Sequence, residues 1–112
     1  MLLTLRKWNY TSVEHFWQIT RVLLIVAGCL ILLHLAEIAV WGSFYLWAGA
    51  MPDAGSALYF SGVTYTTVGY GDLVLGESWR PLAPIEALTG ILMCAMSAGY
   101  FFSVIHSIYH MK

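Results

Sequence analysis

The chain has 112 residues, of which 60% are hydrophobic and 15% aromatic, while only 10% are charged and the formal net charge is −1. Soluble domains carry about 25% charged residues, so this composition indicates a membrane protein. A chain without excess positive charge is also a poor candidate for binding nucleic acid, and we expect no such partner.

The N-terminal segment, residues 1–20, mixes aromatic and charged side chains, with Trp8 and Trp17 close to Arg6 and Lys7. Aromatic rings and basic groups are typical of the boundary between membrane and water. We therefore expect an amphipathic segment that lies in the inner interface and contacts membrane lipid. A disordered tail is the alternative interpretation.

Two long apolar stretches follow this segment. Residues 87–105 contain no charged side chain, and residues 22–47 contain Glu37 and His34 as their only groups that ionise near neutral pH. A spanning helix needs about 20 predominantly apolar residues, so both stretches qualify. The expected fold class is an all-α membrane protein, with an outer transmembrane helix over residues 22–47 and an inner one over residues 84–108.

Basic residues concentrate at the two ends of the chain. Arg6, Lys7 and Arg21 precede the first span and Lys112 follows the second, whereas Arg80 alone lies between the spans. The positive-inside rule places loops rich in Lys and Arg in the cytoplasm. We expect a multi-pass integral membrane protein, located in the cell (plasma) membrane, with both termini cytoplasmic.

The segment between the spans begins with a helix signal. Pro52 suits the first turn of a helix, and Asp53 beside it complements the positive end of the helix dipole. We expect a short helix over residues 52–66, which is too short to span and too apolar for an exposed loop. Such a re-entrant segment is tolerated at membrane depth only where it is buried in protein or lines water.

The short helix leads into the sequence TYTTVGYGD, residues 64–72. Residues 67–72 strongly resemble the selectivity filter of potassium channels, and the order of span, short helix, filter and span resembles the two-transmembrane pore module of that family. The resemblance implies that K⁺ ions are held by one strand from each of four subunits. The implied ion-binding residues are Thr67, Val68, Gly69, Tyr70 and Gly71, acting through backbone carbonyls and the Thr67 hydroxyl.

Elementary chemistry supports this interpretation of residues 67–72. A dehydrated cation needs oxygen ligands without a full charge, because a carboxylate would bind too tightly to release it. Successive carbonyls point the same way only if alternate residues adopt conformations that Cβ atoms disfavour, and Gly69 and Gly71 supply these. Val68 and Tyr70 would then face away and pack behind the filter. One strand cannot surround an ion, so we expect a homotetramer that binds K⁺ and needs no organic cofactor.

The resemblance also implies residues that support the filter. The C-terminal end of the short helix, near Thr66, carries a partial negative charge that would favour a cation at the pore centre. Asp72 would sit at the outer mouth. Tyr59 aligns with an aromatic residue that braces the filter in many family members, so a hydrogen bond from Tyr59 to Asp72 is expected. Val63 stands where some bacterial members have a Glu, which removes one brace.

Small residues on the predicted inner helix suggest a gate. By the resemblance, Gly90 lies where the family often has a hinge glycine. Ile91, Cys94 and Ala98 continue along one helical face and would line the cavity and the lower gate, and Gly99 with Ala98 would allow close helix crossing. Simple packing of small residues is an equal alternative for Gly90.

Five polar residues within or near the spans need partners or roles. His34 and Glu37 share one face of the first helix, and Glu86 lies near the outer end of the second. An intramembrane acid is costly and usually paired, so we expect Glu37 to contact His34 or a polar group on the short helix. His106 and His110, four residues apart, could sense acid, although interfacial histidines without such a role are commoner.

Three functions compete at this stage. Passive, selective K⁺ conduction leads, and a non-conducting partner or regulatory subunit of another channel is the first alternative. A haem protein with His34 and His106 as ligands is the second, but it would leave the filter sequence unexplained. The chain is not expected to be an enzyme. It has no arginine ladder for voltage sensing, so control would come from the pore, the N-terminal segment, lipid, pH or another subunit.

Overall fold

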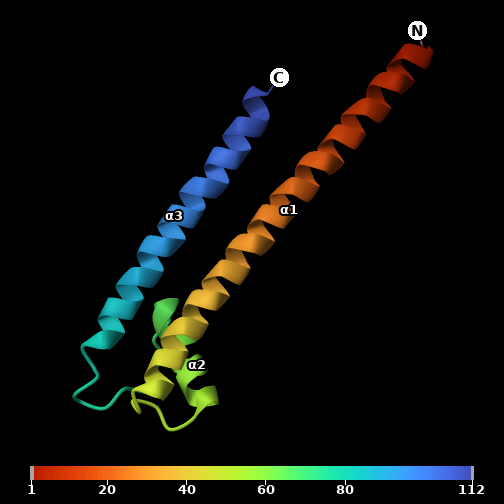
Figure 1. Cartoon of the computed structure of the whole chain (residues 1–112). Coiled ribbons are helices and arrows are strands. Elements are labelled where there is room, and N and C mark those ends of the chain that lie inside the picture. The colour runs from red at the N-terminus through yellow and green to blue at the C-terminus, as the bar shows by residue number, and fades with distance from the viewer. Residues whose placement is uncertain (1, 112) are drawn as a thin grey trace.

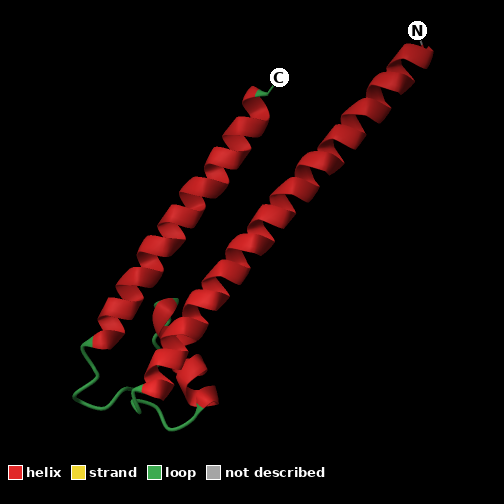
Figure 2. Cartoon of the chain, viewed as in Figure 1, coloured by secondary structure: helices red, strands yellow, loops and turns green. Residues whose placement is uncertain are grey.

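The computed structural model describes the backbone of residues 2–111 and the side chains of residues 13–111. The chain forms three helices, α1 (Leu2–Trp47), α2 (Ala54–Tyr65) and α3 (Leu82–His110). The described residues include no strand, which confirms the all-α fold class (Figure 2). α1 and α3 run antiparallel with both chain ends at one end of the molecule, and α2 packs at the other (Figure 1). The whole is elongated, with extents of 74 × 23 × 22 Å.

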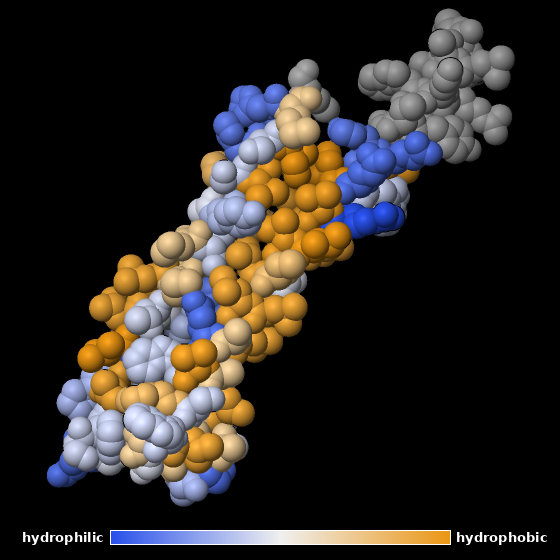
Figure 3. Space-filling view, in the orientation of Figure 1, coloured by the Kyte–Doolittle hydropathy of each residue, from blue (hydrophilic) through white to orange (hydrophobic). Residues whose placement is uncertain are grey.

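Two segments, Val13–Trp47 within α1 and Leu82–His110, are long and apolar enough to cross a membrane. Their large apolar side chains are mostly exposed on the single chain, as at Leu24, Leu32 and Met96. Apolar residues cover most of the visible face of the long helices, with hydrophilic residues mainly toward the two ends (Figure 3). Because continuous apolar surface is unfavourable in water, these faces are suited to contact with lipid or with other chains.

Both long helices extend beyond their predicted bounds. α3 begins and ends two residues outside the predicted range 84–108. α1 continues without a break through residues 20 and 21, so the expected division between an N-terminal segment and the outer helix is absent from the secondary structure. The side chains of residues 1–12, including the aromatic and basic groups of the predicted interfacial segment, lie outside the described residues. The interfacial position of residues 1–20 stays a prediction.

Helix α2 begins two residues later than predicted because Asp53 is its N-cap. Asp53 has extended backbone angles, and its carboxylate accepts hydrogen bonds from the Ser56 backbone N–H at 2.9 Å and the Ser56 hydroxyl at 2.7 Å. A capping carboxylate satisfies amide groups that have no partner within the helix, so regular helix starts after it. Pro52 therefore lies before the helix and not in its first turn.

The buried apolar core lies at the end of the molecule opposite the termini. It consists of Tyr45, Met51, Ala57, Phe60 and Leu75. The Tyr45 and Phe60 rings meet edge to face with centroids 5.4 Å apart, which packs α2 against α1. α2 also approaches α1 closely at Gly42, where an added Cβ would lie only 3.2 Å from Leu58 Cα. This core fixes the position of α2. The predicted filter segment, residues 67–72, follows shortly after the C-terminal end of α2.

Candidate functional site

The backbone of the predicted filter alternates in handedness. Thr67, Gly69 and Gly71 have φ angles of 63°, 56° and 77°, whereas Val68 and Tyr70 between them do not have positive φ. The left-handed conformation costs glycine little, and the conformation predicted for Gly69 and Gly71 is confirmed, whereas their role in ion binding stays a prediction. Thr67 was not predicted to share this conformation. A β-branched residue in the left-handed conformation costs of order 1–3 kcal/mol, and such strained residues are typical of functional sites. Nothing in the residue type of Thr67 predicts this conformation.

Short-range hydrogen bonds attach this segment to the last turn of α2. The Thr67 backbone N–H donates to the Thr64 carbonyl at 2.9 Å, and the Gly69 N–H donates to the Val63 carbonyl, also at 2.9 Å. The Thr66 hydroxyl donates to the Gly62 carbonyl at 2.7 Å. The segment therefore starts from a defined position at the C-terminal end of α2.

The far end of the segment is held by the predicted brace. The Tyr59 hydroxyl donates a 2.7 Å hydrogen bond to Asp72 Oδ2, which confirms the expected contact. This bond lowers the pKa of the Asp72 carboxyl and raises the pKa of the Tyr59 phenol. Asp72 thus stays ionised in more acidic water than an ordinary Asp. It places a negative charge at the C-terminal end of the segment.

The segment lies on the surface of the single chain. Residues 66–72 are all exposed, with Val68 at 52% and Tyr70 at 73%. The expected packing of Val68 and Tyr70 behind the filter is therefore not formed within one chain. Any wall behind these side chains has to come from another copy or another molecule.

The close packing of α3 against α2 centres on Gly90, which is buried. A Cβ built on Gly90 would collide with the Tyr65 carbonyl oxygen and lie 2.9 Å from its carbonyl carbon. The absence of a side chain is thus needed for packing, which supports the packing alternative; a hinge role stays a prediction. The other predicted gate residues are exposed on the single chain and their role is likewise still a prediction: Ile91, Cys94, Ala98 and Gly99.

A polar cluster joins α1 to the end of α2. The Tyr65 hydroxyl donates a hydrogen bond to Glu37 Oε2, and His34 Nδ1 lies 3.1 Å from the same oxygen and 3.0 Å from the Tyr65 hydroxyl. Both expected partners of Glu37, His34 and a polar group on the short helix, are therefore present. The cluster ends at Tyr65, two residues before Thr67.

A second polar cluster surrounds Glu86, whose side chain is fully buried. The Tyr45 hydroxyl donates to Glu86 Oε2 at 2.7 Å, and Ser61 Oγ lies 2.5 Å from Glu86 Oε1. Ser61 Oγ also lies 2.9 Å from the Ile38 carbonyl oxygen. Sequence reasoning singled out Glu86 but missed all of these partners, since each lies on another helix.

The two C-terminal histidines are neighbours in space. The His106 and His110 rings have centroids 4.1 Å apart, and both side chains are exposed. Their acid-sensing role stays a prediction. Among the side chains that the structure describes, no group of three or more His, Cys, Asp or Glu is placed to hold a metal ion.

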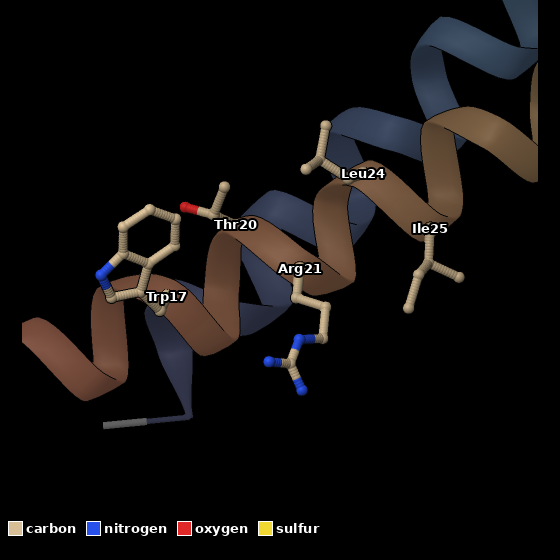
Figure 4. Close-up of a pocket in the computed structure, with 5 residues that line it drawn as sticks. All are labelled: Trp17, Thr20, Arg21, Leu24 and Ile25. Atoms are coloured by element: carbon tan, nitrogen blue, oxygen red, sulfur yellow. The ribbon is translucent and has the colours of Figure 1, made fainter.

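A shallow hollow on α1 lies far from the filter segment. It is lined by Trp17, Thr20, Arg21, Leu24 and Ile25, all from one face of a single helix (Figure 4). No second element closes it, so it is not a built binding site. An aromatic and a basic side chain beside an apolar stretch are typical of the membrane interface.

Comparisons with known proteins agree with this geometry. A protein-family model described as "Ion channel" matches residues 33–107. The matched region covers more than half of the chain and includes α2, the filter segment and nearly all of α3. Comparisons with curated proteins and with solved structures find no match.

Proposed function

Because the chain belongs to this ion channel family and is not an enzyme, we propose that it forms a potassium-selective pore that conducts K⁺ passively as a homotetramer. It is an integral membrane protein with two candidate spans that flank a short helix. The observation that carries the proposal is the alternation of positive φ at Thr67, Gly69 and Gly71 within the sequence TVGYG.

The alternation favours K⁺ because of what it does to the backbone oxygens. When every second residue is left-handed, carbonyl groups that would point to opposite sides of an extended strand can point to the same side. A ring of such carbonyls replaces the hydration shell of K⁺ without the full charge that would prevent release. The K⁺ ion is thus the conducted species and the only bound cofactor in this proposal.

The exposure of the filter segment supports a tetramer. One chain offers one strand, and a K⁺ filter of this type uses four. The exposed Val68 and Tyr70 side chains and the apolar faces of α1 and α3 are surfaces that neighbouring chains and lipid would cover. The alternative of a partner subunit in another channel predicts the same exposed surfaces but no conduction by the chain alone.

The orientation in the membrane is also part of the proposal. Both chain ends lie at one end of the molecule, and α2 lies at the other (Figure 1). The excess of basic residues near the chain ends places them in the cytoplasm by the positive-inside rule, with the filter mouth outside the cell membrane.

Ion flux from liposomes that contain the purified protein tests this proposal. We expect K⁺ flux well above that of protein-free liposomes, little Na⁺ flux, and a block by Ba²⁺. Equal Na⁺ and K⁺ flux would contradict the selectivity. No flux from a correctly folded protein would instead favour the partner-subunit alternative.

A further inference from the structure

The Glu86 cluster contains more close oxygen contacts than an ionised carboxylate can explain. The three contacts join Tyr45 Oη to Glu86 Oε2, Ser61 Oγ to Glu86 Oε1, and Ser61 Oγ to the Ile38 carbonyl oxygen. Every hydrogen bond needs a proton between its two oxygens. The Tyr45 and Ser61 hydroxyls supply one each, and a backbone carbonyl supplies none.

An ionised Glu86 would therefore leave two protons for three contacts. Ser61 can give its single proton either to Glu86 or to the Ile38 carbonyl, and the other contact would bring two lone pairs together. A protonated Glu86 resolves this, because it donates to Ser61, Ser61 donates to Ile38, and Tyr45 donates to Glu86 Oε2. Each of the three contacts then contains one proton, and the hydrogen bonds run in one direction from Tyr45 through Glu86 and Ser61 to Ile38.

The surroundings of Glu86 favour the same state. Its side chain has 0% exposure even in the single chain, and the Ser61 and Tyr45 side chains are equally buried. Among the described residues, the one contact with ion-pair geometry joins His34 and Glu37, so no basic side chain lies within ion-pair distance of Glu86. Burial of an unpaired carboxylate is so costly that such groups neutralise instead.

We propose that Glu86 is held as a neutral carboxylic acid that donates a hydrogen bond to the Ser61 hydroxyl and acts as a positioning residue for α2. The chain of hydrogen bonds links all three helices, through Tyr45 and Ile38 on α1, Ser61 on α2 and Glu86 on α3. It holds α2 at Ser61, six residues before Thr67. Its effect on conduction rests on the proposed function, but the protonation state does not.

Infrared spectroscopy of the full-length protein in lipid near neutral pH tests the protonation state. We expect a carbonyl band of a protonated carboxylic acid that is present in the wild type, absent in Glu86→Gln, and retained in Glu14→Gln, a matched change at an exposed position of α1. In Ser61→Ala the band should move to higher frequency, because the acid loses its acceptor. The infrared measurement does not depend on ion flux, so the protonation state of Glu86 can be determined even if the protein does not conduct K⁺.

Rescue by an isosteric neutral residue tests the positioning role. Gln at position 86 can donate an N–H to Ser61 and accept from Tyr45, so Glu86→Gln should keep the thermal midpoint of unfolding and, if the pore conducts, the K⁺ flux. Glu86→Ala should lower the thermal midpoint of unfolding and abolish the K⁺ flux. An absent acid band in a folded wild type would overturn the neutral state. A Glu86→Gln protein as unstable as Glu86→Ala would overturn the hydrogen-bond chain.

Discussion

The Tyr59 hydroxyl and the Asp72 carboxylate, 13 positions apart in the chain, are joined by a 2.7 Å hydrogen bond. It connects the middle of α2 to the residue that ends the filter segment, so the segment is tied to α2 at both ends. The bond depresses the pKa of Asp72, because the phenol donates a hydrogen bond that stabilises the ionised carboxylate.

In the Tyr59→Phe variant, Asp72 should become protonated at a higher pH than in the wild type. A carboxyl group with a depressed pKa in the folded state contributes stability above its ordinary pKa and loses that contribution as the pH falls through the folded value. Without the Tyr59 hydroxyl, the pKa of Asp72 moves back toward its ordinary value. A pH titration of the Asp72 carboxyl carbon by NMR measures this shift directly.

The matched control is Tyr100→Phe, which makes the same change at an exposed position of α3. The titration of Asp72 should not change in that variant. An Asp72 titration that stays the same in Tyr59→Phe would show that the hydrogen bond does not determine its ionisation.

The second prediction concerns the contact of α3 with the end of α2. Gly90→Ala should destabilise the protein by about 1–3 kcal/mol, because the new methyl group overlaps the Tyr65 carbonyl and the helices must separate. Chemical unfolding in detergent, followed by circular dichroism, measures the loss. The control is Gly99→Ala on the same helix, where an added Cβ meets nothing within 4 Å in the single chain.

Gly99→Ala should be neutral or stabilising in the detergent-solubilised single chain, since Ala is favoured over Gly in a helix by roughly 1 kcal/mol. Equal stability of the Gly90→Ala and Gly99→Ala proteins would mean that the close approach at Gly90 is not rigid. That result would favour the interpretation of Gly90 as a hinge over the packing interpretation.

The third prediction concerns the cluster of Glu37, His34 and Tyr65. Tyr65 is 2% exposed and its hydroxyl donates to Glu37, so Tyr65→Phe removes this donor and leaves His34 as the remaining contact of the Glu37 carboxylate. We expect a loss of about 1.5–3 kcal/mol in unfolding free energy, which is typical of the loss of a hydrogen bond to a charged group. Glu37→Gln should also lower stability and tetramer yield. Unchanged stability in both variants would remove the structural role of the cluster.

Local chemistry explains why parts of this fold could be predicted from the sequence. The start of α2 was predicted to within two residues from Pro52 and Asp53, because both residues act on the backbone of their immediate neighbours. The long apolar runs define α1 and α3 for the same reason, since membrane crossing depends mainly on length and composition. The left-handed Gly69 and Gly71 were predicted because only glycine adopts that conformation at little cost.

The features that could not be predicted depend on contacts between distant residues. The partners of Glu86 on α1 and α2 lie 41 and 25 positions away, and nothing in the local sequence selects Tyr45 or Ser61. The positive φ of Thr67 runs against the preference of its residue type, so only the folded segment reveals it. The continuity of α1 through residue 20 was missed because mixed aromatic and charged residues suit an interfacial segment and a helical extension equally.

The last prediction separates backbone conformation from packing in the filter segment. An added Cβ meets nothing within 4 Å at Gly69 or at Gly76, but Gly69 has a φ of 56°, whereas Gly76 does not have positive φ. Gly69→Ala therefore carries the left-handed penalty of roughly 1–2 kcal/mol, and Gly76→Ala does not.

If residues 67–71 bind K⁺ in the folded protein, added K⁺ should raise the thermal midpoint of the wild type by mass action. Gly76→Ala should keep this rise and the K⁺ flux into liposomes, and Gly69→Ala should lose both. Thermal unfolding in K⁺ and in Na⁺ measures the first, and a flux assay the second. Identical behaviour of the two variants would show that the left-handed conformation at Gly69 is not needed to present the carbonyl oxygens to the ion.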